Sequence, residues 1–171
     1  IFALSGKARA SNAPAVEGVR LAMEEISKRY EKGVYNREIE ILYFDNESSP
    51  IGSHLAAKKA LAENVSVIIG ASWSSHSLAI ARIAQHNKIP MISPISTIPS
   101  LTWIGDYIFR ICYNDDFQGK AIATFAYKDL QSKKALIFTD IASDFSLNIS
   151  KTFQRRYTEL GGEIAAVVEY K

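Results

Sequence analysis

The chain has little cysteine, no long hydrophobic run and no large excess of charge of either sign. Its 171 residues include one cysteine, Cys112, so no internal disulfide can form, and its apolar surroundings favour a buried thiol over a reactive one. Apolar runs are far shorter than the roughly 18 residues that a membrane span needs. The net charge of +2 argues against a nucleic-acid-binding arm. With 47% hydrophobic residues, the composition predicts a folded, soluble protein of one ordinary domain or two small ones.

Several motifs of enzymes and cofactor-binding proteins are also missing. Residues 5–8 read Ser-Gly-Lys-Ala after the first predicted strand, which is neither a dinucleotide-binding glycine motif nor a P-loop. His54, His76 and His86 have no metal-ligand spacing. The sequence therefore predicts no cofactor and no metal. The N-terminus lacks a basic region and a long hydrophobic segment, so we expect any signal peptide to have been removed or never present.

Short strand-like runs alternate with longer segments of helical period, which is typical of α/β proteins with a doubly wound parallel sheet. The predicted strands cover residues 1–5, 38–45, 66–70, 90–93, 107–112, 134–139 and 163–169. The predicted helices cover residues 13–31, 51–63, 76–87, 116–131 and 146–160, with a short helical segment at 98–104. Gly161-Gly162 and Lys32-Gly33 are expected to end the last helix and the first.

The strand-like runs at 65–69 and 135–138 are continuously apolar or nearly so, which favours burial of both faces of the sheet. The short helical segment at 98–104 is followed by a new strand, and such a break is a place where a chain can leave one sheet for another. We therefore predict a lobe boundary near 113–118, with a first unit at 1–113 and a second at 114–171.

Ligands of open parallel sheets bind at the carboxyl ends of the strands. The loop after the strand at 66–70 passes through a cluster of serines into a helix that begins near Ser75. The free N–H groups and positive dipole end of that helix would bind a carboxylate or a phosphate, with a serine hydroxyl beside them. The alternative is that Ser74 or Ser75 is only an N-cap.

The next loop follows the strand at 90–93 and contains Pro94, which keeps the residue before it out of helical conformation. Its free carbonyls and the Thr97 hydroxyl could accept hydrogen bonds from an ammonium group. The alternative is a turn that only leads into the helical segment at 98–104. An anion site on one loop and acceptors on its neighbour together predict a site for a zwitterion.

An enzymatic alternative is an α/β-hydrolase that uses Ser74 or Ser75. The G-x-S-x-G motif is absent, and His76 follows directly in sequence, so its side chain is expected to point away from both hydroxyls. Asp45 and Asp140 end their strands near the expected cleft, but carboxylates there commonly cap the following turn. The sequence therefore predicts a protein that is not an enzyme.

A series of short motifs runs along nearly the whole chain in a characteristic order. They are Ser5-Gly6, Glu17–Ala22, Ile39–Asp45, Val67–Gly70 with Ser74-Ser75, Ile89–Pro94 with Ser96-Thr97, Phe109-Arg110, Asp116–Gly119, Asp144–Ser146 and Gly161–Glu163. This order and spacing resemble those of the type I periplasmic binding proteins, and among them the branched-chain amino acid receptors of ABC transporters.

The resemblance implies a set of ligand-binding residues. Ser74 matches the serine that binds the ligand carboxylate with nearby backbone amides, and Ile95 and Thr97 match the positions whose carbonyl and hydroxyl receive the ammonium. The neighbouring Ser75 and Ser96 are included in the expected site. Phe145 stands where relatives often have a tyrosine that covers the ligand, and Trp73 stands where some have a smaller residue, so the ligand stays open.

Such receptors have two α/β lobes and are about twice as long as this chain, which would supply most of lobe one and the start of lobe two. The resemblance implies capture of an amino acid or similar small carboxylate between hinged lobes, for delivery to the membrane permease of an ABC transporter. It implies a periplasmic or extracellular location, compatible with a lipid anchor, and no nucleic-acid partner. An extracellular sensing domain of a signalling receptor remains an alternative within the same fold. A sugar-responsive transcription regulator would require a DNA-binding headpiece, and none is visible in the sequence.

Overall fold

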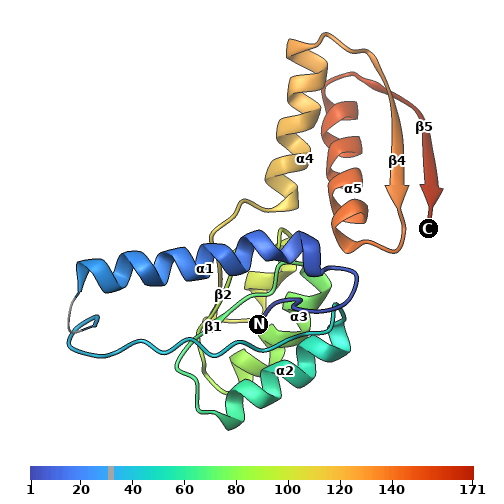
Figure 1. Cartoon of the computed structure of the whole chain (residues 1–171). Coiled ribbons are helices and arrows are strands. Elements are labelled where there is room, and N and C mark those ends of the chain that lie inside the picture. The colour runs from blue at the N-terminus through green and yellow to red at the C-terminus, as the bar shows by residue number, and fades with distance from the viewer. Residues whose placement is uncertain (31–32) are drawn as a thin grey trace.

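The computed structural model describes residues 1–30 and 33–171 and confirms the α/β class. Its helices and strands alternate along the chain (Figure 1). The helices are α1 (Arg9–Arg29), α2 (Pro50–Ala62), α3 (Ser74–His86), η1 (Pro99–Trp103), α4 (Asp115–Thr124), the π-helical turn η2 (Phe125–Asp129) and α5 (Asp144–Glu159). The strands are β1 (Ile68–Ile69), β2 (Met91–Ser93), β3 (Ile108–Arg110), β4 (Lys134–Asp140) and β5 (Glu163–Tyr170).

The strands form two parallel sheets. One has the order β1-β2-β3, and the other pairs β4 with β5. In the first sheet Ile68, Met91 and Ile108 stand side by side and are buried. Alanines of α2 and α3, among them Ala57 and Ala81, complete this core, and their small side chains allow the two helices to lie side by side over the sheet. The carboxyl ends of β1 and β2 are therefore held at one edge.

Two of the predicted strands are wrong in extent. Segments 1–5 and 38–45 meet only in one parallel bridge, between Phe2 and Asp45. Asn46 N–H donates to the Phe2 carbonyl at 3.0 Å, but the rest of segment 38–45 has no ladder in the described structure. An apolar run becomes a strand only where a neighbouring strand accepts its backbone hydrogen bonds, and this pairing partner is not encoded locally.

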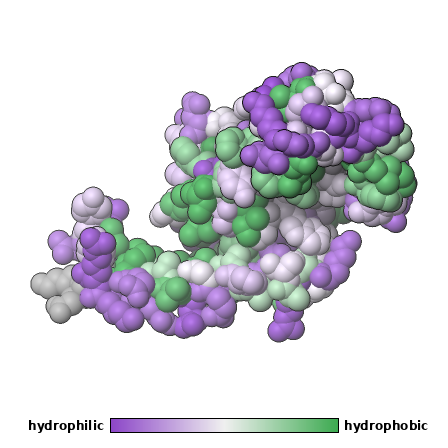
Figure 2. Space-filling view, turned by 90° about the horizontal axis from the view of Figure 1, so that it is seen from above, coloured by the Kyte–Doolittle hydropathy of each residue, from purple (hydrophilic) through white to green (hydrophobic). Residues whose placement is uncertain are grey.

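The expectation that both faces of each sheet are buried is also wrong. Leu136 and Phe138 of β4 are 54% and 64% exposed, whereas α4 and α5 pack against each other beside the sheet. The view from above shows hydrophobic areas next to hydrophilic ones on the surface (Figure 2). Continuously apolar strands indicate a sheet that is covered on both faces, but the described helices of this chain cover only part of the sheet surface.

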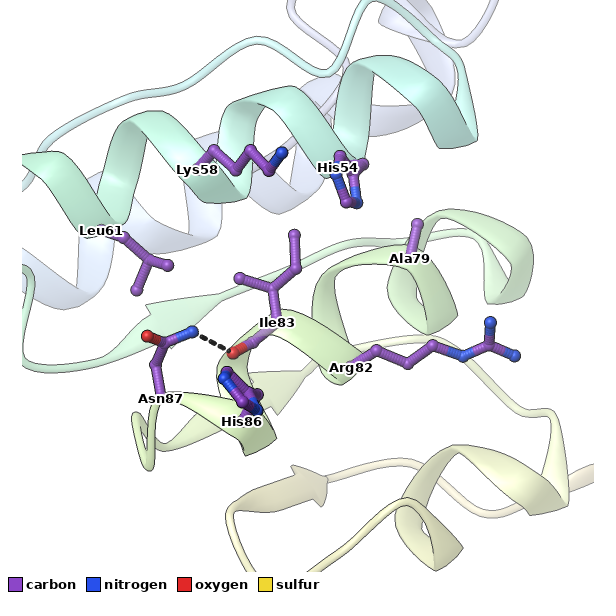
Figure 3. Close-up of a pocket in the computed structure, with 8 residues that line it drawn as sticks. All are labelled: His54, Lys58, Leu61, Ala79, Arg82, Ile83, His86 and Asn87. Atoms are coloured by element: carbon purple, nitrogen blue, oxygen red, sulfur yellow. Dashed lines mark hydrogen bonds between the residues drawn. The ribbon is translucent and has the colours of Figure 1, made fainter.

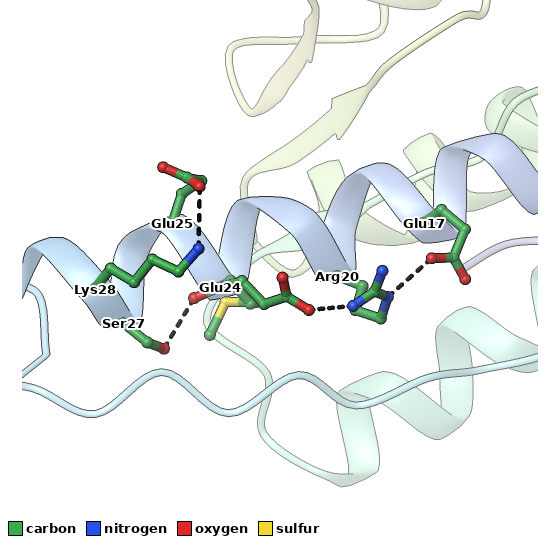
Figure 4. A network of polar contacts seen from close by, with 7 residues as sticks. Glu17, Arg20, Glu24, Glu25, Ser27 and Lys28 are labelled. Atoms are coloured by element: carbon green, nitrogen blue, oxygen red, sulfur yellow. Dashed lines mark hydrogen bonds and ion pairs between the residues drawn. The ribbon is translucent and has the colours of Figure 1, made fainter.

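The first helix is mostly solvated along its length. It begins at Arg9, four residues earlier than predicted, and it includes Pro14. Figure 4 shows ion pairs along the exposed surface of α1, where Arg20 contacts both Glu17 and Glu24. The helix ends at Arg29, and the predicted stop at Lys32 lies outside the described residues, as does the predicted last helical residue at position 31.

The other helices agree with the sequence within a few residues. The predicted helix 116–131 is divided into α4 and η2, because its last part has π-helical rather than α-helical bonding. Asn114 caps α4 through its side chain, which accepts from Phe117 N–H at 3.0 Å. No helix among the described residues has the length and hydrophobicity of a membrane span.

Candidate ligand-binding site

The two serine- and threonine-containing loops predicted from the sequence meet at the carboxyl ends of β1 and β2. These strands are parallel neighbours, so the loop that leads into α3 and the loop that leads into η1 leave the same edge of the sheet. Ile98 N–H in the second loop donates to Ser74 Oγ of the first at 3.4 Å. The structure therefore brings Ser74 and the 95–98 segment together.

A buried network of hydroxyl groups joins the two loops. The Oγ atoms of Ser77, Ser93 and Ser96 converge on the Ala71 carbonyl, at 2.9, 2.8 and 3.2 Å. Ser77 and Ser96 also contact each other, and Ser96 Oγ lies 3.2 Å from the Ser72 carbonyl. All three serines are at most 1% exposed. The network fixes the positions of both loops relative to the sheet.

Ser74 lies at the N-terminus of α3, but its hydroxyl does not cap that helix. The N-cap residue is Trp73, which makes no side-chain cap hydrogen bond. The N-cap alternative for Ser74 is therefore wrong, because its Oγ accepts from the neighbouring loop instead. Among the described residues, the N–H groups of Ser74, Ser75 and His76 have no protein acceptor, as is usual for the first turn of a helix. These N–H groups and the helix dipole are suited to a carboxylate.

Trp73 and His76 form an aromatic pair beside this helix start. Their ring centroids are 5.2 Å apart, and Trp73 is 39% exposed whereas His76 is buried. Burial, with a smaller effect from the charge of Lys7, lowers the pKa of His76. Asn46 Nδ2 lies 3.3 Å from His76 Nδ1, so the neutral ring accepts there and carries its proton on Nε2. His76 makes no hydrogen bond with Ser74 or Ser75 in the described structure.

The segment after β2 presents its predicted residues in different directions. Ile95 is half-exposed, whereas the Ser96 hydroxyl is turned into the buried network and is thus already occupied. Thr97 is partly buried, and its carbonyl accepts from Asp115 N–H at 2.9 Å. Cys112 is also partly buried, with Sγ 3.4 Å from the Ser96 carbonyl, and burial raises the pKa of its thiol.

Phe145 comes from the other sheet. It lies in the first turn of α5, at the carboxyl end of β4, and is 44% exposed. The helices α3 and α5 approach each other, and in Figure 1 α5 begins close to the first sheet with its helices. Phe145, at the carboxyl end of β4, thus lies in the part of the second unit that is near the first sheet and its helices.

Asp45 and Asp140, which lie at the ends of two of the predicted strands, stabilise turns. Capping of the following turn is the role that the sequence indicates for carboxylates at such positions. Asp45 Oδ1 accepts from the N–H groups of Leu4, Ser5 and Glu47 at 2.9, 3.2 and 2.8 Å. Burial pushes the pKa of Asp45 upward, but these hydrogen bonds hold it below the ordinary value. Asp140 Oδ1 accepts from Ala142 N–H at 2.9 Å. In both residues Oδ1 accepts backbone hydrogen bonds of the adjacent turn.

Asp115 is a residue of this region that the sequence reasoning missed. Its side chain is fully buried, and neither carboxylate oxygen has a hydrogen-bond partner within the described structure. Burial raises its pKa, an effect that the nearby Thr97 hydroxyl and Arg110 charge only partly oppose. The sequence predicts a helix from residue 116 and a lobe boundary near 113–118, and this gives Asp115 no binding role. A sequence signal was present, since two acidic residues, Asp115 and Asp116, follow shortly after the mostly apolar run that contains β3.

Two surface cavities lie away from these loops. One, of about 550 Å³, lies between α2 and α3 (Figure 3). Figure 3 shows His54 and Lys58 on one wall and Arg82 and His86 on the other. The second, of about 780 Å³, lies between α4 and α5. Neither includes a predicted site residue, and within residues 1–30 and 33–171 there is no cluster of side chains suited to a metal ion.

Comparisons with known proteins agree with the α/β fold. The model of a family described as periplasmic binding protein matches residues 1–171. A leucine-binding protein from Thermotoga maritima, LivK, is similar in structure, with a TM-score of 0.87 and 37% identity, over 99% of this chain and 47% of that one. LivJ from Streptococcus pneumoniae, solved in complex with isoleucine, has a TM-score of 0.90 and 31% identity, over 99% and 47%.

Curated proteins show the same likeness at lower identity. The Leu/Ile/Val-binding protein BraC3 of Rhizobium johnstonii is 25% identical over 141 residues, which are 82% of this chain and 38% of that protein. The chain thus spans less than half the length of the relatives that it matches.

Proposed function

The chain belongs to the periplasmic binding protein family, and we propose that it forms the ligand-binding part of a type I solute-binding protein for an amino acid or a related small carboxylate. The observation that carries this proposal is the joining of the two loops by the Ser74 to Ile98 contact and the buried serine network. The Ser74 to Ile98 contact joins the start of α3, whose first N–H groups have no protein acceptor in the described structure, to the loop that contains Ile95 and Thr97. A zwitterion needs both kinds of partner.

In the proposed complex the ligand carboxylate binds the Ser74 hydroxyl and the first N–H groups of α3, with Ser75 beside it. The ammonium donates to the Ile95 carbonyl and the Thr97 hydroxyl. Ser96 contributes by holding its loop in place, since its own hydroxyl is engaged. Trp73 and Phe145, both partly exposed, would contact the remainder of the ligand.

We propose residues 1–113 and 114–171 as parts of two lobes, each with its own parallel sheet. A ligand that contacts Ser74 in one and Phe145 in the other would stabilise the closed arrangement, to the extent that it binds that state better than the open one. The relatives suggest a membrane permease of an ABC transporter as the partner and the periplasm or the extracellular side as the location.

Binding without chemical change is favoured over hydrolysis. In the described chain the Ser74 and Ser75 hydroxyls have no histidine or carboxylate partner that could remove a proton. The imidazole nearest in sequence, His76, bonds to Asn46 instead. A nucleophilic serine requires such a base within hydrogen-bond reach.

A thermal-shift screen followed by calorimetry tests the proposal. The intact protein is titrated with L-leucine, L-isoleucine and L-valine, and with 4-hydroxybenzoate as a carboxylate that lacks an ammonium group. An amino acid at 100 times its dissociation constant should stabilise the protein by about 2.7 kcal/mol. Chromatography of the recovered ligand should show it unaltered. No stabilisation by any of these four ligands, or consumption of the ligand, would contradict the proposal.

A further inference from the structure

The carboxylate of Asp115 is an unusual group in this fold. It is 0% exposed, and both of its oxygens lack hydrogen-bond partners in the described structure. A buried charge that is not paired is costly, and such groups persist mainly where they serve a function. Asp115 is also the first residue of α4, directly after the segment that connects the two sheets.

The surrounding charges do not satisfy this carboxylate. Arg110 of β3 lies close enough to affect it, but its guanidinium donates to the carbonyls of Ile98 and Pro99, at 2.7 and 3.1 Å, and to Thr102 Oγ1 at 3.0 Å. Asp116 of α4 adds a second negative charge, and its Oδ1 accepts from the Thr152 hydroxyl of α5 at 3.2 Å. Asp115 therefore lies near one cation, Arg110, whose guanidinium makes three hydrogen bonds to other groups and none to this carboxylate in the described structure.

Two polar neighbours remain: the Cys112 thiol, whose pKa is raised by burial and also by the Asp115 charge, and Thr97, which the proposed function places against the ligand ammonium. Asp115 N–H donates to the Thr97 carbonyl at 2.9 Å, and the Thr97 hydroxyl lies near the carboxylate, although not in hydrogen-bonding geometry. A hydroxyl has one proton and two lone pairs. If the Thr97 hydroxyl donates its hydrogen bond to the Asp115 carboxylate, its lone pairs are left to accept from an ammonium group.

We propose that Asp115 is a positioning residue for the ammonium group of a zwitterionic ligand and acts through the Thr97 hydroxyl. The carboxylate orients and polarises this hydroxyl as an acceptor, and its negative charge attracts the ammonium without touching it. The inference rests on the proposed function and extends it, because it links the ligand amine to the first helix of the second sheet. It predicts a preference for α-amino acids over carboxylates of the same shape that lack the amine.

The proposal requires ligand binding to be coupled to the release of a proton from Asp115. Burial raises the pKa of Asp115, and a bound ammonium nearby would lower it again. The liganded protein would then hold fewer protons than the free one, so protons are released on binding. Affinity should rise with pH through the range in which free Asp115 ionises.

Calorimetry of the intact protein with L-leucine tests this linkage, in buffers of different ionisation enthalpy between pH 4 and pH 7. The comparison ligand is 4-methyl-2-oxopentanoate, which has the same side chain and carboxylate but no ammonium. The variants are Asp115→Asn and, as the matched control on the same helical turn, Asp116→Asn, whose native side chain is turned toward Thr152.

The expected result is proton release with leucine in the native protein and in Asp116→Asn, and its loss in Asp115→Asn. At pH 7, Asp115→Asn should bind leucine about tenfold more weakly, as expected for loss of a charge-assisted hydrogen bond, and should bind the oxo acid within about twofold of the native protein.

Two outcomes overturn the inference while leaving the proposed function intact. One is leucine binding without proton release in the native protein, a measurement that does not depend on the folding of any variant. The other is equal weakening of leucine and oxo acid in Asp115→Asn, which would indicate only a structural role. If the native protein binds the oxo acid but no amino acid, the inference also fails and the proposed function stands. If it binds neither, both fail.

Discussion

The hydroxyl oxygens of Ser77 and Ser96 lie 2.5 Å apart in a buried position beside the carboxyl ends of β1 and β2. Ser77 belongs to α3 and Ser96 to the loop after β2, so this contact connects the two segments that form the candidate site. Ser96 also reaches the carbonyls of Ala71 and Ser72. The two loops thus behave as one unit, although 19 residues separate the two serines.

Replacement of Ser96 by alanine should disturb both stability and binding. The change leaves the Ser72 carbonyl without its Ser96 donor, and a lost buried hydrogen-bond partner costs about 1–3 kcal/mol. Amino acid binding should weaken several-fold, because the 95–97 segment loses its anchor. Urea unfolding and calorimetry would measure the two effects. Ser66→Ala, at an exposed serine, is the control, and equal behaviour of both variants would contradict the proposed role.

Ser74→Ala should act on ligand affinity. A hydrogen bond to a carboxylate contributes about 1.5–3 kcal/mol, so the dissociation constant should rise by roughly tenfold or more. The Ile98 N–H also loses its acceptor, so thermal unfolding is measured in parallel to separate the two effects. Unchanged affinity by calorimetry would remove Ser74 from the site.

Intrinsic fluorescence can locate the ligand, since the chain has two tryptophans, Trp73 and Trp103. Trp73 stands next to the start of α3, whereas Trp103 lies in η1 and is 78% exposed. Ligand addition should change the emission of the native protein and of Trp103→Phe, but not that of Trp73→Phe. A signal that disappears with Trp103 instead would place the ligand elsewhere.

Two glycine-to-alanine changes should have opposite effects. A Cβ at Gly119 would come within 2.7 Å of Thr152 Cβ, where α4 crosses α5, so Gly119→Ala should destabilise the protein by about 1–3 kcal/mol. A Cβ at Gly18 of α1 would meet nothing within 4 Å, so Gly18→Ala should stabilise it by about 0.5–1 kcal/mol. Denaturant unfolding measures both, and a tolerated alanine at 119 would mean that the two helices can separate at little cost.

The buried carboxylate of Asp115 should also affect stability as a function of pH. Its folded-state pKa is raised by burial, so its contribution is most favourable below the unfolded-state value near 3.8 and is lost as the pH rises through the folded-state pKa. Relative to the native protein, the free energy of unfolding of Asp115→Asn should rise by about 1–3 kcal/mol between pH 4 and pH 7. Unfolding curves at several pH values measure the difference, and a constant difference would show that Asp115 does not titrate in this range.

Much of the fold could be predicted from hydrophobic periodicity and turn residues. Each helix of the described chain agrees with a predicted one within a few residues, because helical periodicity and the residues that end helices are local features of the sequence. Segment 38–45 has an apolar pattern as well, yet it makes only a single bridge at Asp45. Strand formation depends on a partner far along the chain, and no local pattern reports whether that partner is in register.

The site was predicted in part for the same reason. A parallel sheet brings neighbouring strand ends to one edge, so two polar loops after successive strands could be expected to meet there. The sequence by itself thus determined the helices, the α/β class and the two polar loops that follow neighbouring strands. Only the tertiary structure decided that the Ser96 hydroxyl is engaged inside the loops, that the Ser74 hydroxyl faces Ile98, and that Asp115 is buried without a partner. Burial and hydrogen-bond partners arise from contacts between distant segments, and these are set by packing rather than by any residue type or spacing.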